Sequence, residues 1–243
     1  MASRKCWVML ENNPDVMNNL ARSLGLSEKL AFYDVYSLDE PELLAHIPRP
    51  AYALLAIIPM NEAWLSERTA EDKHKDEYTG YGQDEPVIWF KQTIGHACGS
   101  IGLLHSVING PASDFILPGS HLEKIRTDAI PLKIAERAQM LYDCQPFEAA
   151  HAAVAPLGDT TALDPALQNG LHFVSFVKAE DGHLWELEGS RKCPIDRGVL
   201  ENNEDVLSPR AIELGLGRTI KLAQTAGTET LNFSCIVLAP SNV

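Results

Sequence analysis

The alternation of hydrophobic and polar positions along the chain predicts a mixture of strands and helices. A continuous apolar run over residues 51–59 is typical of a strand that is buried on both faces. Further strand-like segments are short and apolar, and they lie at 5–10, 32–36, 171–177, 184–187 and 231–238. No repeat and no domain-splitting linker appears, so we expect residues 1–243 to form a single α/β domain.

Apolar residues at helical spacing predict the helices. The first helix is expected to begin after Asn13, which is a good N-cap, with Pro14 at its first position. Gly25 is a good C-terminal stop for the same helix. Further helices are expected at 40–46, 99–109, 132–144 and 209–224.

Two segments show no clear periodicity of hydrophobic residues. Residues 69–84 are charged and contain glycines, which predicts a mobile surface loop. Residues 149–170 are rich in Ala, Pro, Gly and Thr, and we interpret most of them as a long connection. Loops longer than about 15 residues are uncommon in compact domains and are usually functional or disordered. The second segment is therefore a candidate for a functional role.

Charge narrows the range of partners. The chain has 20 Lys and Arg against 33 Asp and Glu, which gives a net charge of −13. An acidic surface repels phosphate backbones, so we expect no nucleic-acid partner. Such a surface attracts a basic protein or peptide, although many soluble proteins are acidic for solubility alone. We expect no membrane partner, because no apolar run reaches the roughly 18 residues that a spanning helix needs and the N-terminal apolar stretch is too short for a signal peptide.

The cysteines indicate a reducing compartment. They are five in number, lie at positions 6, 98, 144, 193 and 235, and form no C-x-x-C pair. This spacing argues against a disulfide framework and against a zinc site, and we expect no metal and no cofactor. We expect the chain to be cytoplasmic, with the nucleus as a second compartment.

Cys98 is the candidate reactive thiol. Polar and small residues from Gln92 onward lead directly into an apolar helical pattern at Cys98. A cysteine at a helix N-terminus feels the positive end of the helix dipole, which favours its thiolate. The backbone N–H of Cys98 is not used by the helix and can face an oxyanion, and the Gln92 side chain can add a second donor. The alternative is that Cys98 is an inert core residue, as most buried cysteines are.

A thiolate nucleophile needs a base, and His172 is the best placed of the eight histidines. His105 falls on the apolar face of the helix that follows Cys98, so we interpret it as a core histidine. A three-residue turn at 180–182 would place Val174 opposite Glu188 on the paired strand. Because side chains alternate between faces, His172 and Glu188 would then be diagonal neighbours on one face. With a two-residue turn they would point to opposite faces, and Glu188 would be an ordinary solvated acid.

Several motifs in order along the chain carry a resemblance to a known family. They lie at residues 10–14, 32–36, 92–102, 171–173 and 181–189. With these motifs the chain resembles the ubiquitin C-terminal hydrolases, papain-like cysteine peptidases that release small adducts from the C-terminus of ubiquitin. The similarity extends over roughly residues 5–238, and several ordered motifs are far more specific than one short pattern.

The resemblance implies a role for each site residue. It makes Cys98 the nucleophile, His172 the general base and Gln92 the oxyanion-hole donor. Glu188 stands where the family usually has Asp, and this chain has one extra residue between the histidine and the acid. His96 replaces an asparagine that the family often has two residues before the cysteine.

The resemblance also implies a fold. It predicts a central antiparallel sheet flanked by helices, with a papain-like core and a knotted chain path. A crossover loop above the active site corresponds here to residues 149–170. Such a loop would restrict the leaving group to small adducts or unfolded peptide tails.

The function implied is that of a monomeric deubiquitinating thiol hydrolase with ubiquitin as its partner. Glu11, Asp15 and Asp34 lie in or beside the N-terminal motifs and are predicted ubiquitin contacts. For Asp15, a first-turn charge that suits the helix dipole is an equally good reading. Two alternatives remain open: a ubiquitin-binding module with weak catalysis, because Glu188 is not Asp, and a hydrolase that prefers a ubiquitin-like modifier such as Nedd8.

Overall fold

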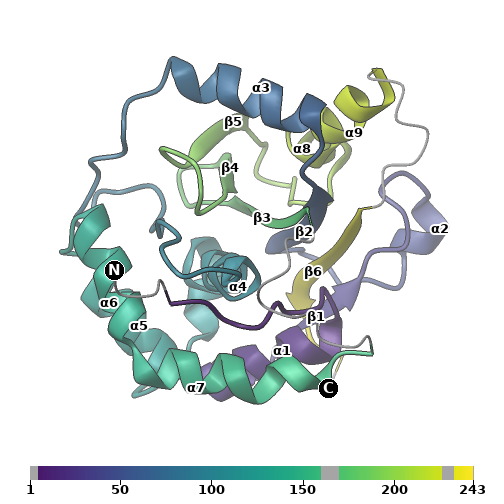
Figure 1. The fold of residues 1–243 in the computed structure, drawn as a ribbon. Helices are drawn as coiled ribbons and strands as arrows, with labels where there is room; N and C mark the ends of the chain where they lie inside the picture. The colour runs from purple at the N-terminus through teal and green to yellow at the C-terminus, as the bar shows by residue number, and fades with distance from the viewer. Residues whose placement is uncertain (1–4, 160–169, 226–232, 243) are drawn as a thin grey trace.

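A central sheet of six antiparallel strands organises the computed structural model, which describes residues 5–159, 170–225 and 233–242. The strands lie in the order β1-β6-β2-β3-β4-β5 (Figure 1). Their bounds are β1 (Leu30–Asp34), β2 (Ala53–Pro59), β3 (Leu171–Lys178), β4 (His183–Leu187), β5 (Ile195–Val199) and β6 (Ser234–Pro240). The prediction of an antiparallel sheet with flanking helices is confirmed.

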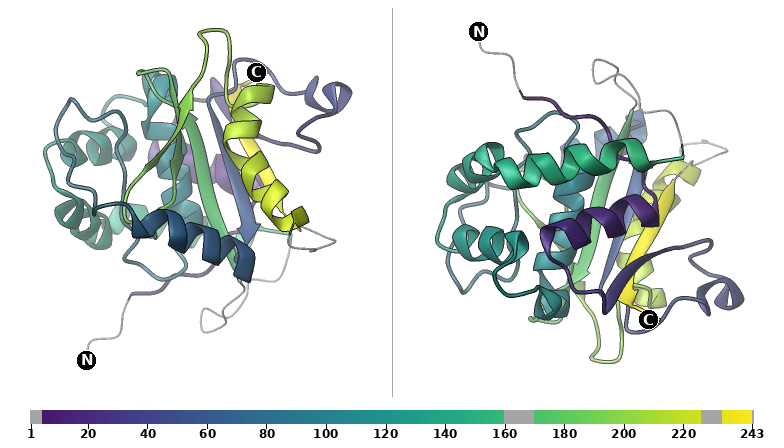
Figure 2. Two further views of the ribbon diagram at one scale, coloured as in Figure 1. Left: turned by 90° about the horizontal axis from the view of Figure 1, so that it is seen from above. Right: turned by 90° about the horizontal axis from the view of Figure 1, so that it is seen from below.

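Helices cover both faces of the sheet (Figure 2). One face carries α1 (Pro14–Leu24), α4 (Cys98–Ile108), α5 (His121–Ala129), α6 (Ile134–Asp143) and α7 (Gln145–Val154). The other face carries α3 (Glu62–Lys73), α8 (Pro209–Leu214) and α9 (Leu216–Thr225), and the short α2 (Pro41–Leu44) lies beside the sheet edge.

The apolar run at residues 51–59 forms β2, the strand predicted to be buried on both faces. Leu55 packs into the core on the α4 side, whereas Leu54 and Ala56 pack into the core on the α3 side. These residues are almost fully buried, so burial on both faces explains why the sequence shows no alternation.

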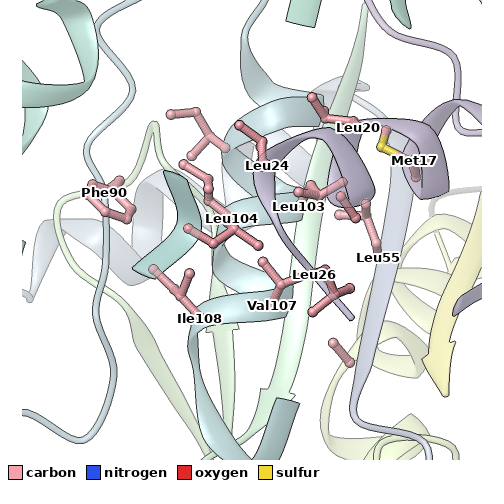
Figure 3. Close-up of a cluster of buried hydrophobic side chains, with 14 of the residues drawn as sticks. Met17, Leu20, Leu24, Leu26, Leu55, Phe90, Leu103, Leu104, Val107 and Ile108 are labelled. Carbon is pink, nitrogen blue, oxygen red and sulfur yellow. The ribbon is translucent and has the colours of Figure 1, made fainter. Parts of the chain in front are cut away.

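Helix α4 runs through the larger core, where its residues pack against α1 and the sheet (Figure 3). Gly102 lets the helix approach the sheet closely, because a Cβ there would lie 2.7 Å from Leu55 Cδ1. Every residue of the helix after Cys98 is buried, so the helix is packed on all sides. Its first residue, Cys98, is fixed at the end of a rigid element.

The ends of α1 follow the sequence prediction. The Asn13 side chain accepts a hydrogen bond from the backbone N–H of Asp15, Pro14 opens the helix, and Gly25 ends it with φ 107°. Glycine adopts this left-handed conformation without the steric penalty that a side chain would add.

The strand predicted at 5–10 was wrong, and two predicted loops were wrong at their first residues. Residues 5–10 form no strand and make only an isolated bridge between Cys6 and Gly95. The predicted loop at 69–84 begins inside helix α3, whose only buried residue is Trp64, so the helix has almost no apolar period to detect. The predicted connection at 149–170 begins inside α7, where the small residues are helix-forming alanines rather than loop residues.

Further boundaries differ. Helix α5 was not predicted, and the expected helix at 209–224 is divided into α8 and α9 at Gly215. No helix within the described part of the chain is long and apolar enough to cross a membrane. Residues 160–169 of the expected crossover loop lie outside the described residues. The knotted path and the single domain over 1–243 therefore stay predictions.

Candidate active site

Cys98, His172 and Glu188 meet where the N-terminus of α4 faces the start of β3. Cys98 is the first residue of α4, as predicted from the sequence, and its side chain is half-buried. His172 is the second residue of β3, and Glu188 directly follows β4. Both are buried, and the Glu188 side chain is fully enclosed.

The β3–β4 hairpin has the predicted register. Its ladder pairs Lys178 with Leu184 and Ser175 with Leu187, and the same register sets Glu188 opposite Val174. The backbone N–H of Ala179 donates to the His183 carbonyl at 3.0 Å. Gly182 has φ 80°, the left-handed conformation expected in a three-residue turn. The extra residue in this chain therefore lengthens the turn and leaves the strand pairing intact.

That register brings the histidine and the acid together. His172 Nε2 lies 2.5 Å from Glu188 Oε1. Burial alone would lower the pKa of His172, but the Glu188 carboxylate and the Cys98 sulfur outweigh it and raise the pKa to about 10. His172 is therefore held as an imidazolium at neutral pH.

The pKa of the Cys98 thiol shifts in the opposite direction. Burial would raise the pKa of Cys98, but hydrogen bonding to His172 and the charge of the imidazolium lower it. Backbone N–H groups of Gly99 and Phe173 also donate to the sulfur and favour the thiolate. The arrangement is a thiolate–imidazolium pair at a helix N-terminus, which suits nucleophilic attack.

Glu188 remains ionised in this buried place because of its neighbours. Burial raises its pKa, but His172, Arg68 and the Ser190 side chain lower it to about 2. The Ser190 N–H donates to Oε1 at 2.7 Å, and Arg68 Nη2 lies 3.1 Å from Oε2. The Trp89 indole N–H donates to the backbone carbonyl of Glu188 at 3.3 Å.

Gln92 lies beside Gly189, the residue that follows Glu188. Its backbone N–H donates to the Gly189 carbonyl at 2.7 Å, and a Cβ on Gly189 would lie 3.0 Å from Gln92 Cβ. The Gln92 side-chain Nε2 donates to the Ile94 carbonyl at 3.1 Å. An amide nitrogen carries two hydrogens, so the second remains to be offered to an oxyanion.

Two other histidines near the site have different roles. His105 is fully buried in α4, its Nε2 accepts from the Phe90 N–H at 2.9 Å, and burial lowers its pKa to about 3. The interpretation of His105 as a core histidine is confirmed. His96 has φ 56°, a left-handed conformation that forms the turn into α4.

Comparison with known proteins decides the family. The sequence pattern of the family described as "Ubiquitin carboxyl-terminal hydrolase, family 1" matches residues 7–215. The chain belongs to the ubiquitin carboxyl-terminal hydrolase family. The resemblance found in the sequence motifs is confirmed, and with it the class of cysteine peptidase.

Relatives match over most of the chain. Ubiquitin carboxyl-terminal hydrolase 3 of Arabidopsis thaliana is 34% identical over 239 residues, which cover 98% of this chain and 96% of that protein. The isozyme L1 of Homo sapiens is 33% identical over 198 residues, which cover 82% of this chain and 84% of that protein.

Among solved structures, the fold is similar to the catalytic domain of Trichinella spiralis UCH37 bound to ubiquitin vinyl methyl ester. The TM-score is 0.70 at 18% identity, with 96% of this chain and 95% of that chain covered. This likeness supports the fold, since it covers nearly the whole of both chains.

The predicted substrate contacts lie on other segments of the chain than the triad residues. Asp15 is exposed at the start of α1, and Asp34 is the last residue of β1. Burial raises the pKa of Asp34, His46 lowers it, and the charge of Asp15 raises it further, so the two acids lie within electrostatic range. Glu11 lies elsewhere, against Gly158, which lies four residues beyond the last residue of α7.

Arg68 and Ser190, which both contact Glu188 or its neighbours, were not predicted from the sequence. Arg68 belongs to α3, and the charged character of that segment concealed the helix. The available signal was the spacing of Arg68, Glu71 and Asp72, which places them on one helical face. Across the described ranges, no group of three or more His, Cys, Asp or Glu side chains could hold a metal ion.

Proposed function

We propose that Cys98, His172, Glu188 and Gln92 carry out the hydrolysis for which the family is named. The observation that carries this proposal is the buried His172–Glu188 contact of 2.5 Å, with the same imidazole hydrogen-bonded to Cys98. Because Nε2 is engaged by Glu188, Nδ1 is the nitrogen left to serve the sulfur.

The reaction follows from these positions. The Cys98 thiolate attacks the carbonyl carbon of the C-terminal glycine of ubiquitin, and the carbonyl π electrons move to oxygen. The Cys98 N–H and the Gln92 amide stabilise that oxyanion. His172 donates its proton to the leaving amine, and a thioester remains on Cys98. His172 then takes a proton from water, whose oxygen attacks the thioester and releases ubiquitin with a free carboxylate.

The proposed partner is ubiquitin. The family name and the net charge of −13 support this choice, because an acidic surface attracts the basic C-terminal tail of ubiquitin. The proposed substrates are small adducts or short peptides on that tail. We further propose that the chain acts as a monomer, in the cytoplasm and also in the nucleus.

A covalent probe tests the proposal. Ubiquitin with an electrophile at its C-terminus should label the wild-type chain rapidly and at Cys98 alone, as located by peptide mass spectrometry. Cys98→Ser should remove labelling, whereas Cys6→Ser, which alters the exposed thiol, should label like wild type. Slow labelling of wild type would favour a binding module with weak catalysis.

A matched Nedd8 probe addresses specificity. If the chain is a ubiquitin hydrolase, the ubiquitin probe should react faster than the Nedd8 probe at equal concentration. The reverse order would make Nedd8 the preferred modifier and would leave the catalytic residues unchanged.

A further inference from the structure

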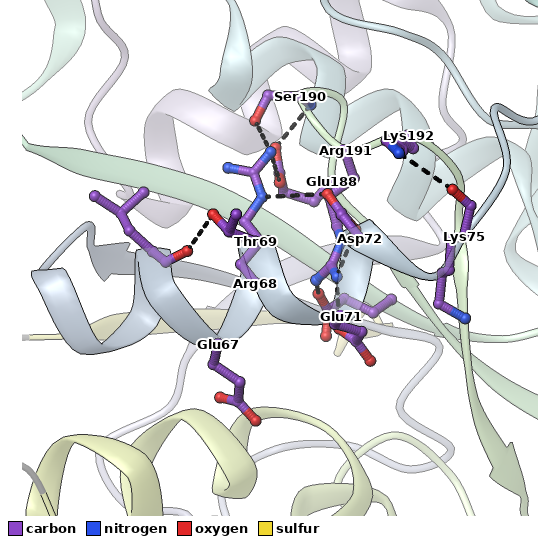
Figure 4. A network of polar contacts seen from close by, with 12 residues as sticks. Glu67, Arg68, Thr69, Glu71, Asp72, Lys75, Glu188, Ser190, Arg191 and Lys192 are labelled. Carbon is purple, nitrogen blue, oxygen red and sulfur yellow. Dashed lines mark hydrogen bonds and ion pairs between the residues drawn. The ribbon is translucent and has the colours of Figure 1, made fainter.

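Helix α3 lies over the end of the sheet that carries the catalytic acid, and one face of it is charged (Figure 4). Arg68, Glu71 and Asp72 project from this face toward the β4–β5 side, and Trp64 lies one turn before them. Trp64 is the only buried residue of α3. Polar contacts rather than apolar burial therefore hold most of this helix in place.

Two contacts of Arg68 converge on Glu188, in addition to the ion pair of Arg68 Nε with Asp72 Oδ2 at 4.0 Å. Its Nη2 lies 3.1 Å from Glu188 Oε2 and donates to Ser190 Oγ at 2.7 Å. Its guanidinium stacks over the Trp64 ring at 5.3 Å from the ring centroid. The Arg68 side chain is 16% exposed and that of Glu188 is 0% exposed, so solvent screens this pair little.

Both oxygens of Glu188 are thereby held. Arg68 faces Oε2 directly, and it also holds the hydroxyl of Ser190, whose backbone N–H donates to Oε1 at 2.7 Å. Oε1 is the oxygen that contacts His172. A glutamate has one more rotatable bond than an aspartate, so it needs more contacts to stay in one position.

We propose that Arg68 is a positioning residue: its guanidinium fixes the Glu188 carboxylate so that Oε1 stays on His172 Nε2. This proposal rests on the proposed function of the triad. Arg68 contacts neither the substrate nor Cys98, and it acts through Glu188.

A second group of ion pairs fixes the helix that carries Arg68. Arg191 pairs with Glu71, Asp72 and Glu186, with distances of 2.5, 2.8 and 3.1 Å. Arg197 of β5 pairs with Glu71 at 2.6 Å and with Glu186 of β4 at 2.7 Å. These contacts tie α3 to the sheet one turn beyond Arg68, so its guanidinium is already in place before substrate binds.

Steady-state kinetics on a fluorogenic ubiquitin C-terminal amide test the proposal. Arg68→Gln should lower kcat about tenfold or more and leave KM within about twofold of wild type, because a misplaced acid impairs chemistry rather than binding. Arg68→Lys keeps the charge and should recover most of the lost rate. Arg218→Gln is the matched control, since Arg218 of α9 pairs with Glu67 of α3 at 3.4 Å and that exposed pair lies apart from Glu188.

A double-mutant cycle separates positioning from general support. In a Glu188→Gln background, adding Arg68→Gln should change kcat by less than about twofold, because the group through which Arg68 acts is already altered. An equal loss in both backgrounds would overturn the proposal, as would an unchanged kcat in Arg68→Gln. Circular dichroism checks that each variant is folded. If Arg68→Gln does not fold, Arg68→Met removes the same charge and carries the test, and a loss of kcat that is equal with and without Glu188→Gln overturns the proposal.

A ubiquitin-independent readout distinguishes failure of this proposal from failure of the proposed function. Iodoacetamide alkylation of Cys98 at neutral pH, followed by mass spectrometry, should be several-fold slower in Arg68→Gln than in wild type and normal in Arg218→Gln. If wild type does not cleave the ubiquitin amide, the proposed function fails, and this alkylation still reports on Arg68. Equal alkylation in wild type and Arg68→Gln would overturn the positioning role.

Discussion

At the scale of single residues, the feature that distinguishes this site is a glutamate in the position of the usual aspartate. The extra turn residue leaves the hairpin register intact, and Glu188 reaches diagonally to His172 from the position opposite Val174. The longer side chain is accommodated because Ser190 and Arg68 hold its two oxygens. The substitution is thus compatible with a complete Cys–His–acid arrangement.

The pH dependence of kcat/KM follows from the shifted pKa values. His172 has its pKa raised to about 10, so its imidazolium persists through neutral pH and is lost as the pH approaches that value. A pH–rate profile of wild type should therefore be flat around neutrality and fall on the alkaline side. Glu188→Gln removes the carboxylate that raises the pKa of His172, so the alkaline fall should move to lower pH and kcat should drop by about 10²-fold or more. An alkaline limb at the same pH in both proteins would show that Glu188 does not act on His172.

Gln92→Ala tests the oxyanion donor. Loss of one donor costs about 10²-fold in kcat in comparable sites, because the donor acts on charge that develops in the transition state. We expect that loss with little change in KM, measured by steady-state hydrolysis of a ubiquitin C-terminal amide. A raised KM with an unchanged kcat would make Gln92 a binding residue instead.

At the scale of the secondary-structure elements, features that depend on residues close together in the chain could be predicted from the sequence. Features that depend on residues far apart in the chain could not. The α1 caps, the N-terminus of α4 and the β3–β4 register depend on residues within a few positions of one another. Helix α3 depends on Arg191 and Arg197, which lie about 120 positions away in the chain. No periodicity within α3 could have revealed those partners, and so Arg68 was missed together with its helix.

Arg191 provides the test at this scale. Its side chain is 3% exposed and faces three carboxylates, two of them on α3. Arg191→Gln should lower the free energy of unfolding by about 3–5 kcal/mol, because the change removes a buried counter-charge that three carboxylates share. Urea unfolding measures this value. Arg218→Gln, which breaks an exposed pair, should change the free energy of unfolding by less than about 1 kcal/mol. Equal effects in the two variants would refute the structural role of the buried network.

At the scale of the whole molecule, the sheet separates two cores and brings two distant halves of the chain to one site. Cys98 comes from the helix on one face, whereas His172 and Glu188 come from a hairpin whose acid is held by α3 on the other face. The family motifs predicted this group of three residues and the antiparallel sheet. The path through residues 160–169 lies outside the described residues, so the size limit on adducts stays a prediction.

The acidic charge of the molecule predicts a salt-dependent affinity. Asp15 and Asp34 lie within electrostatic range of one another, so neutralising both should weaken attraction to the basic tail of ubiquitin. Asp15→Asn combined with Asp34→Asn should raise KM several-fold, leave kcat unchanged and flatten the dependence of KM on salt. Asp128→Asn removes an exposed acid on α5 and serves as the control for net charge. A salt dependence equal to that of wild type would count against the two contacts.

The central claim is that Cys98 is a thiolate because His172, held by Glu188, is an imidazolium. The most direct measurement is the rate of Cys98 alkylation by iodoacetamide as a function of pH, with His172→Gln measured beside wild type. The account predicts that wild-type Cys98 reacts at a plateau rate through neutral pH, whereas in His172→Gln the reaction requires alkaline pH, near the ordinary thiol pKa of 9.0. A wild-type rate that rises only near that ordinary pKa, as it does in the variant, would contradict the account.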